Sequence, residues 1–356
     1  MVKTSAKGTK IFTALSSDAP EINAAAQLIR AGELVAFPTE TVYGLGAHAL
    51  QADAVAKIFA AKGRPADNPL IVHIYDLSQL QSLAADIPAE AMLLAQHFWP
   101  GPLTLIFSKK PGVPDITTGG LETVAVRLPA HSIALALLRQ AGVPVAAPSA
   151  NLSGRPSPTT AAHVLADLDG RISAILDGGP CTVGVESTVL DIRFGEPKLL
   201  RPGGVTPEQI SAVLKRPCHL VHWQPENSDA PPSPGLKYIH YAPRAPLYLL
   251  TGVPEKQLEK LQQLQQTFQA EGKRVGLLIS RESAAKIAGE EVIILGSRNH
   301  PAQLAARLFA ALRSFDAKQV DVIIAEGYSK TGVGLAVMNR LQKAAGSRVI
   351  NVGGDE

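Results

Sequence analysis

Two polar segments that follow apolar runs carry residue types suited to binding a ligand, and in one of them that ligand could be a polyphosphate. Residues 38–45 read Pro-Thr-Glu-Thr-Val-Tyr-Gly-Leu, and their hydroxyls would either bind a ligand or cap the next element. Residues 62–65 read Lys-Gly-Arg-Pro, where the glycine and proline should end a helix and leave Lys62 and Arg64 on extended chain, pointing the same way. An arginine fork beside a lysine charge suits a polyphosphate, although cations at a helix carboxyl end can also be merely solvated.

Two further segments offer hydrogen-bonding groups at the ends of apolar runs. Ser149 and Asn151 follow the run 143–147 and would share one side of an extended strand end. They suit a phosphate or a base edge, or else form a simple turn with an Asx-type hydrogen bond. Arg201 ends another apolar run before two glycines, where it is either an anion ligand or a surface residue.

Two polar residues lie inside apolar runs that predict strands. His73 shares a face with apolar neighbours, which favours a core histidine over a ligand. A buried Arg127 needs an anion, which could be a structural carboxylate or a ligand. Together with the polar segments, these residues supply cations, hydroxyls and an amide without a nucleophile triad or a metal-binding motif. That combination predicts transfer at a phosphate by positioning and electrostatics.

Alternating helical and strand-like patterns must position these groups. The helices expected in the first part of the chain are 21–30, 52–62, 88–99, 132–140 and 206–214. The expected strands are 34–37, 70–75, 103–107, 124–128, 143–147, 172–176, 188–192 and 198–200. Residues 10–215 therefore predict one mixed α/β domain.

A change in composition then predicts a linker and a second domain. Seven prolines in 216–246 indicate an extended, semi-stiff connection. Residues 247–356 alternate again, which predicts a smaller, mostly parallel sheet. The expected strands are 247–250, 275–279, 292–295 and 320–325, and the expected helices are 255–270, 301–315 and 334–344. Residues 332–334 read Gly-Val-Gly but lack the third glycine of a dinucleotide loop, so we expect a helix-entry turn there.

Composition excludes several classes of protein. With 46% hydrophobic and 18% charged residues, the 356-residue chain is not intrinsically disordered. A net charge of +3 does not indicate a general nucleic-acid or membrane binder. Two cysteines can build neither a disulfide framework nor a four-cysteine zinc site. No targeting segment and no apolar run of about 18 residues is visible, so we expect a cytoplasmic protein.

The ordered set of motifs resembles the YrdC-like threonylcarbamoyl-AMP synthases in their long, two-domain form. The similarity rests on 38–45, 62–65 with 68–70, 126–129, 149–151 and 201–203, in that order. Residues 233–238 and 240–243 resemble the joint between the two domains of that form. The resemblance implies an open twisted α/β sheet followed by a Rossmann-like domain. It also implies a nucleotidyltransferase that converts L-threonine, bicarbonate or carbon dioxide, and ATP into threonylcarbamoyl-adenylate and pyrophosphate for tRNA modification.

By this resemblance, specific residues acquire roles. The residues that would hold ATP are Lys62, Arg64, Asn68, Thr123, Ser149, Ser157 and Arg201. Those that would hold L-threonine are Thr41, His73, Arg127, the backbone at Ala147, and Ser187. Lys62, Arg64, Ser149 and Asn151 would serve the chemical step, and a lid would include Pro234 and Tyr238.

The resemblance also sets expectations for cofactors and partners. Magnesium would be held by the ATP phosphates and water, with no protein side chain as ligand. The product would pass to the machinery that transfers threonylcarbamoyl groups to tRNA, and we expect a monomer with at most weak RNA binding. One alternative is an RNA-binding module without catalysis, which the +3 charge does little to support. Another is a hydrogenase-maturation carbamoyltransferase, against which the absence of paired zinc-finger cysteines argues.

Overall fold

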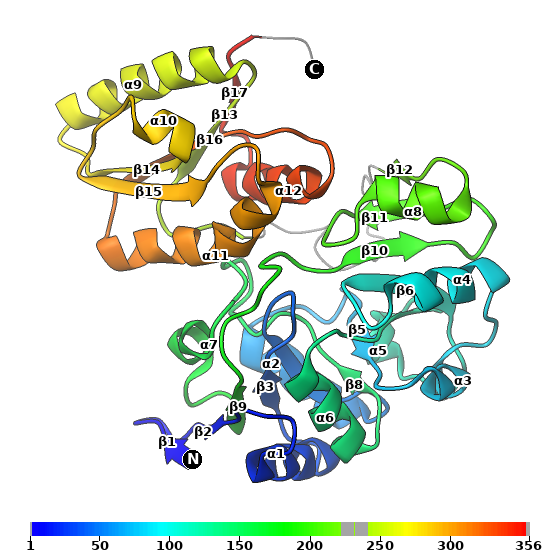
Figure 1. Cartoon of the computed structure of the whole chain (residues 1–356). Coiled ribbons are helices and arrows are strands. Elements are labelled where there is room, and N and C mark those ends of the chain that lie inside the picture. The colour runs from blue at the N-terminus through cyan, green and yellow to red at the C-terminus, as the bar shows by residue number, and fades with distance from the viewer. Residues whose placement is uncertain (1, 222–230, 232–240, 354–356) are drawn as a thin grey trace. The chain divides into compact units, whose positions relative to one another are not determined.

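The computed structural model describes residues 2–221, 231 and 241–353. The predicted lid residues Pro234 and Tyr238 lie outside this described part. The chain divides into two compact units, one formed by Met1–Ser153 with Ser157–Tyr238 and the other by Gly154–Pro156 with Ile239–Glu356. Each unit is described by itself below, and Figure 1 shows the elements of both.

The described strands of the first unit form a 12-stranded mixed sheet. In spatial order they are β1 (Val2–Thr4), β2 (Lys10–Thr13), β9 (Ala174–Asp177), β3 (Val35–Phe37), β4 (Gly44–His48), β8 (Val145–Ala146), β5 (Ile71–His73), β7 (Thr123–Arg127), β6 (Leu103–Ser108), β10 (Thr188–Asp191), β11 (Lys198–Arg201) and β12 (His219–Leu220). The sheet contains both parallel and antiparallel pairs; β5 is parallel to β7 and antiparallel to β8. The expected mixed α/β sheet is confirmed.

Helices and short helical turns cover this sheet. They are α1 (Pro20–Arg30), α2 (Ala52–Lys62), η1 (Leu77–Gln79), α3 (Leu80–Leu83), α4 (Ala89–Phe98), α5 (Asp115–Thr118), α6 (Ser132–Ala141), α7 (Ala161–Leu168) and α8 (Pro207–Leu214). Helices α1 and α6 bury Ile22, Ile29 and Leu137 against Val35 and Leu176 of the sheet. This apolar layer makes the sheet a rigid support for the loops at its strand ends.

The second unit contains a five-stranded sheet whose pairs within the described residues are all parallel. In spatial order its strands are β15 (Glu291–Gly296), β14 (Val275–Ser280), β16 (Val322–Glu326), β13 (Leu247–Thr251) and β17 (Val349–Asn351). Its helices are α9 (Pro254–Ala270), α10 (Arg281–Ala284), α11 (Pro301–Lys318) and α12 (Val333–Ala345). Helix α9 lies on one side of the sheet, and α11 and α12 lie on the other (Figure 1). The expected Rossmann-like parallel α/β architecture is confirmed.

Strands β1, β4 and β17 were absent from the sequence prediction, and each has a weak apolar pattern. Strand β4 contains Gly44 and Gly46, which lowered its strand propensity. A Cβ atom at position 46 would lie 2.8 Å from the ring of Phe37, so the glycine makes room for that ring. The edge strand β1 is wholly exposed, and β17 is exposed or half-buried, so neither shows an apolar run.

The residues 332–334 form the expected helix-entry turn. Gly332 has φ +54° and caps α12, and a Cβ atom at Gly334 would lie 2.2 Å from the carbonyl oxygen of Ser329. The two glycines therefore allow the loop after β16 to fold tightly onto the start of the helix. Within 2–221, 231 and 241–353, no helix combines the length and the apolar character needed to span a bilayer.

Candidate functional site

Arg127, the last residue of β7, is buried and held at three points. Its Nε donates to the carbonyl oxygen of Gly101 (3.1 Å), and its Nη1 donates to Thr41 Oγ1 (2.8 Å). Its Nη2 lies 2.6 Å from Glu40 Oε1, and both side chains are more than nine-tenths buried. The sequence left open whether a carboxylate or a ligand balances this arginine; the structure shows that Glu40 does so. A guanidinium fixed in this way is oriented before any ligand arrives.

The loop that carries Thr41 and Glu40 is ordered by its own hydroxyls. Thr39 Oγ1 accepts hydrogen bonds from the backbone N–H groups of Thr41 and Val42, both at 3.2 Å. It also lies 2.8 Å from Thr41 Oγ1. The sequence left open whether the hydroxyls of residues 38–45 bind a ligand or cap the turn, and the structure shows the capped turn. The same turn places Thr41 against Arg127.

His73 ends β5, and the parallel register places it beside Arg127. Its ring is buried and packs edge-on against Phe37 with a centroid separation of 6.0 Å. Burial, together with the nearby Arg127 charge, lowers the pKa of His73 to about 3. The imidazole is therefore neutral near pH 7, and its Nδ1 makes no hydrogen bond within the described part of the chain.

The depressed pKa predicts that His73 makes stability depend on pH. An unfolded histidine binds a proton near pH 6.5, whereas the folded group does so only near its pKa of about 3. The unfolded state therefore holds more protons between these values, and stability falls as the pH drops below 6.5, by up to about 1.4 kcal/mol per pH unit. The free energy of unfolding can be measured in urea at pH 7 and pH 5 from the fluorescence of the buried Trp99. Between these pH values, His73→Gln should lose less of this free energy than the unaltered chain. Equal losses in both proteins would contradict the assignment.

Lys62 differs from the prediction, because it is the last residue of α2 and does not lie on extended chain. Gly63, with φ 60° and ψ 42°, is the left-handed C-cap that ends the helix directly after Lys62. The Lys62 side chain is buried, and its Nζ donates to the carbonyl oxygens of Ser149 (2.5 Å) and Asn151 (2.6 Å). The alternative of a solvated charge at the helix end is wrong.

The prediction that Ser149 and Asn151 share one side of an extended strand end is also wrong. Ser149 forms a bridge with Gly44, but the Asn151 N–H donates back to the Ser149 carbonyl oxygen at 3.0 Å. The chain therefore turns at this point, because Lys62 draws both carbonyl groups toward one ammonium. The result is a tight loop whose carbonyl oxygens surround a buried cation.

Arg64 and Asn68 form the next part of the site. Arg64 Nη2 donates to the carbonyl oxygen of Asn68 at 3.0 Å, and its guanidinium lies 5.8 Å from the ring centre of Phe59. Asn68 is fully buried, and neither polar atom of its side chain has a hydrogen-bond partner among the described residues. A buried amide without partners costs free energy unless a ligand or water completes it.

Arg201 and Ser187 meet at the start of β10. Arg201 donates from Nε to the Ser187 carbonyl oxygen (3.0 Å) and from Nη2 to Ser187 Oγ (3.1 Å). Ser187 Oγ also lies 2.8 Å from Thr104 Oγ1. Arg201 is 5% exposed, so its interpretation as a surface residue is wrong. The segment 101–102 connects the Arg201–Ser187 pair to Arg127. The Gly101 carbonyl oxygen accepts from Arg127, and the Pro102 carbonyl oxygen accepts from the N–H of Thr188, the residue after Ser187.

Gly203 allows the Arg201 segment to approach Ser187. A Cβ atom there would lie 2.3 Å from the Thr188 nitrogen and 2.4 Å from the Glu186 carbonyl oxygen. We expect Gly203→Ala to push these backbones apart at a cost of about 1–3 kcal/mol, seen as a lower midpoint of urea unfolding. Gly112→Ala is the control, because a Cβ atom there meets nothing within 4 Å. A variant at position 203 as stable as the control would refute this close contact.

The remaining predicted residues lie around these groups. The Ala147 N–H donates to the Ile71 carbonyl oxygen at 2.9 Å, and Ser157 Oγ donates to Glu186 Oε1 at 2.5 Å. Thr123 is half-buried and begins β7, four residues before Arg127. Within the described residues, no hydrogen bond or ion pair joins it to another predicted site residue.

This site combines residues from opposite ends of neighbouring strands, because the strand between them is short. Arg127 and His73 lie at the carboxyl ends of β7 and β5, whereas the loop after β8 lies at the amino end of β5. Strand β5 has three residues, which corresponds to a rise of roughly 7–10 Å. One extended ligand can therefore contact the Arg127 group and the Lys62 group together.

Sequence reasoning singled out the polar segments that contain Glu40 and Glu186 but gave neither residue a role, and it missed Thr104; these residues pair with Arg127, Ser157 and Ser187, respectively. Glu40 stands alone as an acid within the motif 38–45, and a buried Arg127 requires a carboxylate. Together, these two facts could have indicated Glu40 as a candidate partner of Arg127. Thr104 had no such signal, because it lies within an apolar run.

The site offers neither a thiol nucleophile nor a metal ligand set in its described part. Burial raises the pKa of the Cys181 thiol to about 12, which keeps it protonated. Among the described residues, no group of three or more histidine, cysteine, aspartate or glutamate side chains could hold a metal ion.

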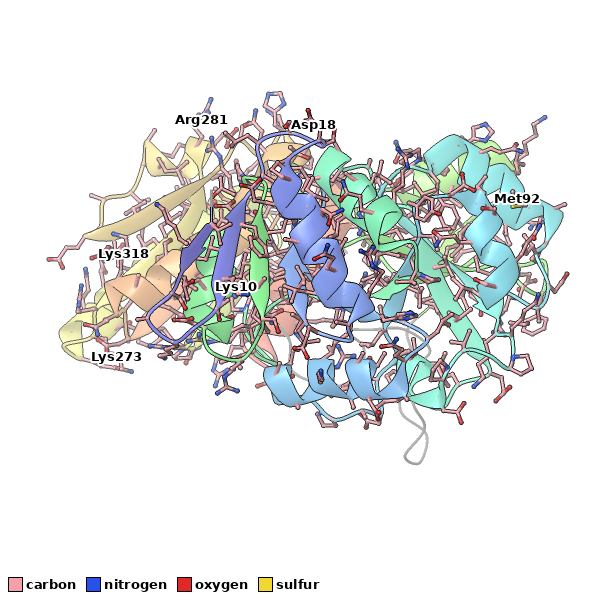
Figure 2. The ribbon with its side chains drawn as sticks, turned by 90° about the horizontal axis from the view of Figure 1, so that it is seen from below. Lys10, Asp18, Met92, Lys273, Arg281 and Lys318 are labelled. Carbon is pink, nitrogen blue, oxygen red and sulfur yellow. The ribbon has the colours of Figure 1, made fainter. Side chains whose placement is uncertain are left out.

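The position of the cations separates this site from the ordinary surface. Lys273, Arg281 and Lys318, labelled at the periphery in Figure 2, are exposed. Lys62, Arg64, Arg127 and Arg201 are all buried in the first unit. Fixed, desolvated cations bind anions more strongly than solvated ones.

Comparisons with known proteins give the family. Residues 27–203 match the Sua5_yciO_yrdC family model, described as telomere recombination. Residues 205–346 match Sua5_C, described as the C-terminal domain of threonylcarbamoyl-AMP synthase. The chain is 56% identical to a threonylcarbamoyl-AMP synthase of Bacillus subtilis, over 94% of this chain and 96% of the relative. It is 52% identical to that of Pyrococcus abyssi, over 93% and 96%.

Solved structures agree with this similarity over both units. The chain resembles P. abyssi Sua5 in complex with L-threonine with a TM-score of 0.90 and 49% identity, covering 96% of this chain and 99% of that one. A double variant of P. abyssi Sua5 gives a TM-score of 0.91 at 48% identity, covering 98% and 99%. The chain belongs to the Sua5/YrdC family of threonylcarbamoyl-AMP synthases.

Proposed function

We propose that the first unit joins L-threonine, carbon dioxide from bicarbonate, and ATP to give threonylcarbamoyl-adenylate and pyrophosphate. The observation that carries the proposal is that only the three-residue strand β5 lies between β7, which ends in Arg127, and β8, which leads into the loop that binds the buried Lys62. The relatives that span the chain are named threonylcarbamoyl-AMP synthases, which favours catalysis over an RNA-binding module.

In this proposal, the Arg127 group holds the amino acid. Its guanidinium would bind the threonine carboxylate, and Thr41 and the neutral His73 would contact the rest of that substrate. Ser187 and the backbone at Ala147 would complete the pocket. The structure of P. abyssi Sua5 with L-threonine shows that a similar chain binds this amino acid.

The Lys62 group would hold the nucleotide. Lys62, Arg64 and Arg201 would face the phosphates, while Asn68, Ser149, Asn151 and Ser157 supply neutral hydrogen-bonding groups. The unpartnered amide of Asn68 supports a polar ligand beside Arg64. Thr123 would reach the nucleotide only from the amino end of β7.

The chemical step then follows from positioning. The threonine amine, after losing its proton, attacks carbon dioxide and forms a carbamate with release of a second proton. A carbamate oxygen attacks the α-phosphorus of ATP, a P–O bond forms, and the bond to the β-phosphate oxygen breaks to release pyrophosphate. The buried cations would stabilise the charge that develops on the phosphates.

Several wider properties belong to the same proposal. Magnesium would enter with ATP and be coordinated by its phosphates and water. The product would serve tRNA threonylcarbamoylation in the cytoplasm, passed on to a transfer enzyme, and the chain would act as a monomer.

A pyrophosphate-release assay tests the proposal. Release should require ATP, L-threonine and bicarbonate together, and omission of any one should reduce it to background. Alanine in place of threonine should give little release, because it lacks the hydroxyl that the polar pocket around Thr41 would bind. Release without an amino acid, or an equal rate with alanine, would refute the substrate assignment.

A further inference from the structure

The second unit contains a cavity of about 670 Å³ at the carboxyl ends of β13 and β16. Binding pockets for small molecules span roughly 300–1,000 Å³. In open α/β sheets, ligands bind outside the carboxyl ends of the strands. All of the residues that line this cavity belong to the second unit, so it is separate from the residues of the site described above.

One end of the cavity is cationic. Arg298 is held there by Nη1 donating to the Gly327 carbonyl oxygen (2.9 Å) and by Nη2 lying 3.2 Å from Glu326 Oε2. Lys330 also lines the cavity and is exposed. Because Glu326 balances Arg298, Lys330 supplies the net positive charge. No aspartate or glutamate is among the described residues that line the cavity.

The other end carries apolar side chains beside the polar Thr251 and Asn351. Val253, Pro254 and Val349 line it at β13 and β17, while the cations lie beside β16. Since β13 lies between β16 and β17, the two kinds of lining stand at opposite ends. An inorganic anion would leave the apolar end uncovered, and an uncharged apolar molecule would leave Lys330 unused. The lining fits an organic anion with a planar or apolar body.

The floor of the cavity is rigid. The buried Gln257 donates from Nε2 to the Gly252 carbonyl oxygen (2.7 Å), and its Oε1 accepts from the Gly327 N–H (2.9 Å). One side chain thus joins the loops after β13 and β16. A Cβ atom at Gly327 would lie 2.5 Å from the Leu250 carbonyl oxygen, so glycine allows this close approach. Binding here would need little reorganisation.

We propose that this cavity binds an organic phosphate of mononucleotide size, with the phosphate at Lys330 and the planar body at Val253 and Val349. The binding is independent of the proposed catalytic function. It gives the second unit a ligand-binding role of its own.

The test uses AMP as the probe and the full chain as the protein. Hydrogen exchange followed by mass spectrometry should show saturable protection of residues 251–257 and 327–331 by AMP. Adenosine and inorganic phosphate should each need at least about tenfold higher concentrations, because each fills one end alone. Protection in the first unit reports the catalytic site and does not bear on this cavity.

Lys330→Glu should weaken the AMP effect at both segments by about tenfold or more, since it reverses the charge at the phosphate end. Lys286→Glu is the matched control, because Lys286 is an exposed lysine of the same unit outside the cavity. Ser329→Trp, which fills the space, should have the same effect as Lys330→Glu. The proposal is overturned if AMP leaves 251–257 and 327–331 unprotected, or if Lys330→Glu binds AMP as Lys286→Glu does.

Discussion

Lys62→Met should lower the rate of threonylcarbamoyl-adenylate formation by about a hundredfold or more. The Lys62 ammonium is buried and lies 2.5 Å and 2.6 Å from the carbonyl oxygens of Ser149 and Asn151. Methionine has similar length but no charge, so the loop loses its cation and the phosphates lose a fixed positive group. Removing one preorganised donor from a reacting oxygen costs about 10²–10³ in turnover.

The control for this variant lies on the same helix. Lys57→Met removes a lysine of α2 that pairs with Glu33 at the surface, and its turnover should stay within about twofold of the unaltered chain. Both variants should keep a folded circular-dichroism spectrum. Comparable turnover in Lys62→Met and Lys57→Met would remove Lys62 from the phosphate site.

Arg127→Lys should raise the KM for L-threonine by roughly 10–150-fold, the range for one charge-assisted hydrogen bond of about 1.5–3 kcal/mol. Lysine keeps the charge but cannot reach Gly101, Thr41 and Glu40 together, as the guanidinium does. The KM for ATP should change far less, because the nucleotide would bind around Lys62. Initial rates at varied threonine and at varied ATP separate the two effects.

Two further variants sharpen this result. Glu40→Gln should raise the KM for threonine by about tenfold, since it removes the carboxylate that orients Arg127 without emptying the site. Arg193→Lys, at a half-buried pair with Asp191 of β10, should change neither KM. If Arg127→Lys raises the two KM values equally, the amino-acid role of Arg127 is wrong.

The fold was largely predictable where apolar periodicity is strong. Helix α2 was predicted over its observed range, and strands such as β6 were placed within one residue, because their buried faces repeat regularly. Strand β4 was not predicted, because its glycines lower the strand propensity. Gly46 is required by the ring of Phe37 on the neighbouring strand, a contact that the local sequence does not show. Edge strands β1 and β17 bury too little apolar surface to leave a pattern.

The candidate site was predictable in its residues more than in its geometry. The motifs identified Lys62, Arg127 and Arg201, all of which are buried. The sequence could not show that the Lys62 side chain reaches the loop at Ser149, because this hydrogen bond joins residues 87 positions apart. Nor could it choose Glu40 as the partner of Arg127, since that pairing joins residues 87 positions apart.

The central claim is that one site in the first unit joins threonine, carbon dioxide and the adenylyl group of ATP. Mass spectrometry of a reaction with ATP, L-threonine and ¹³C-labelled bicarbonate tests it most directly. The account predicts a single product that contains threonine, one ¹³C atom and AMP, formed with pyrophosphate and missing from the Lys62→Met reaction. An adenylate without the ¹³C label, or a labelled product formed equally by Lys62→Met, would contradict it.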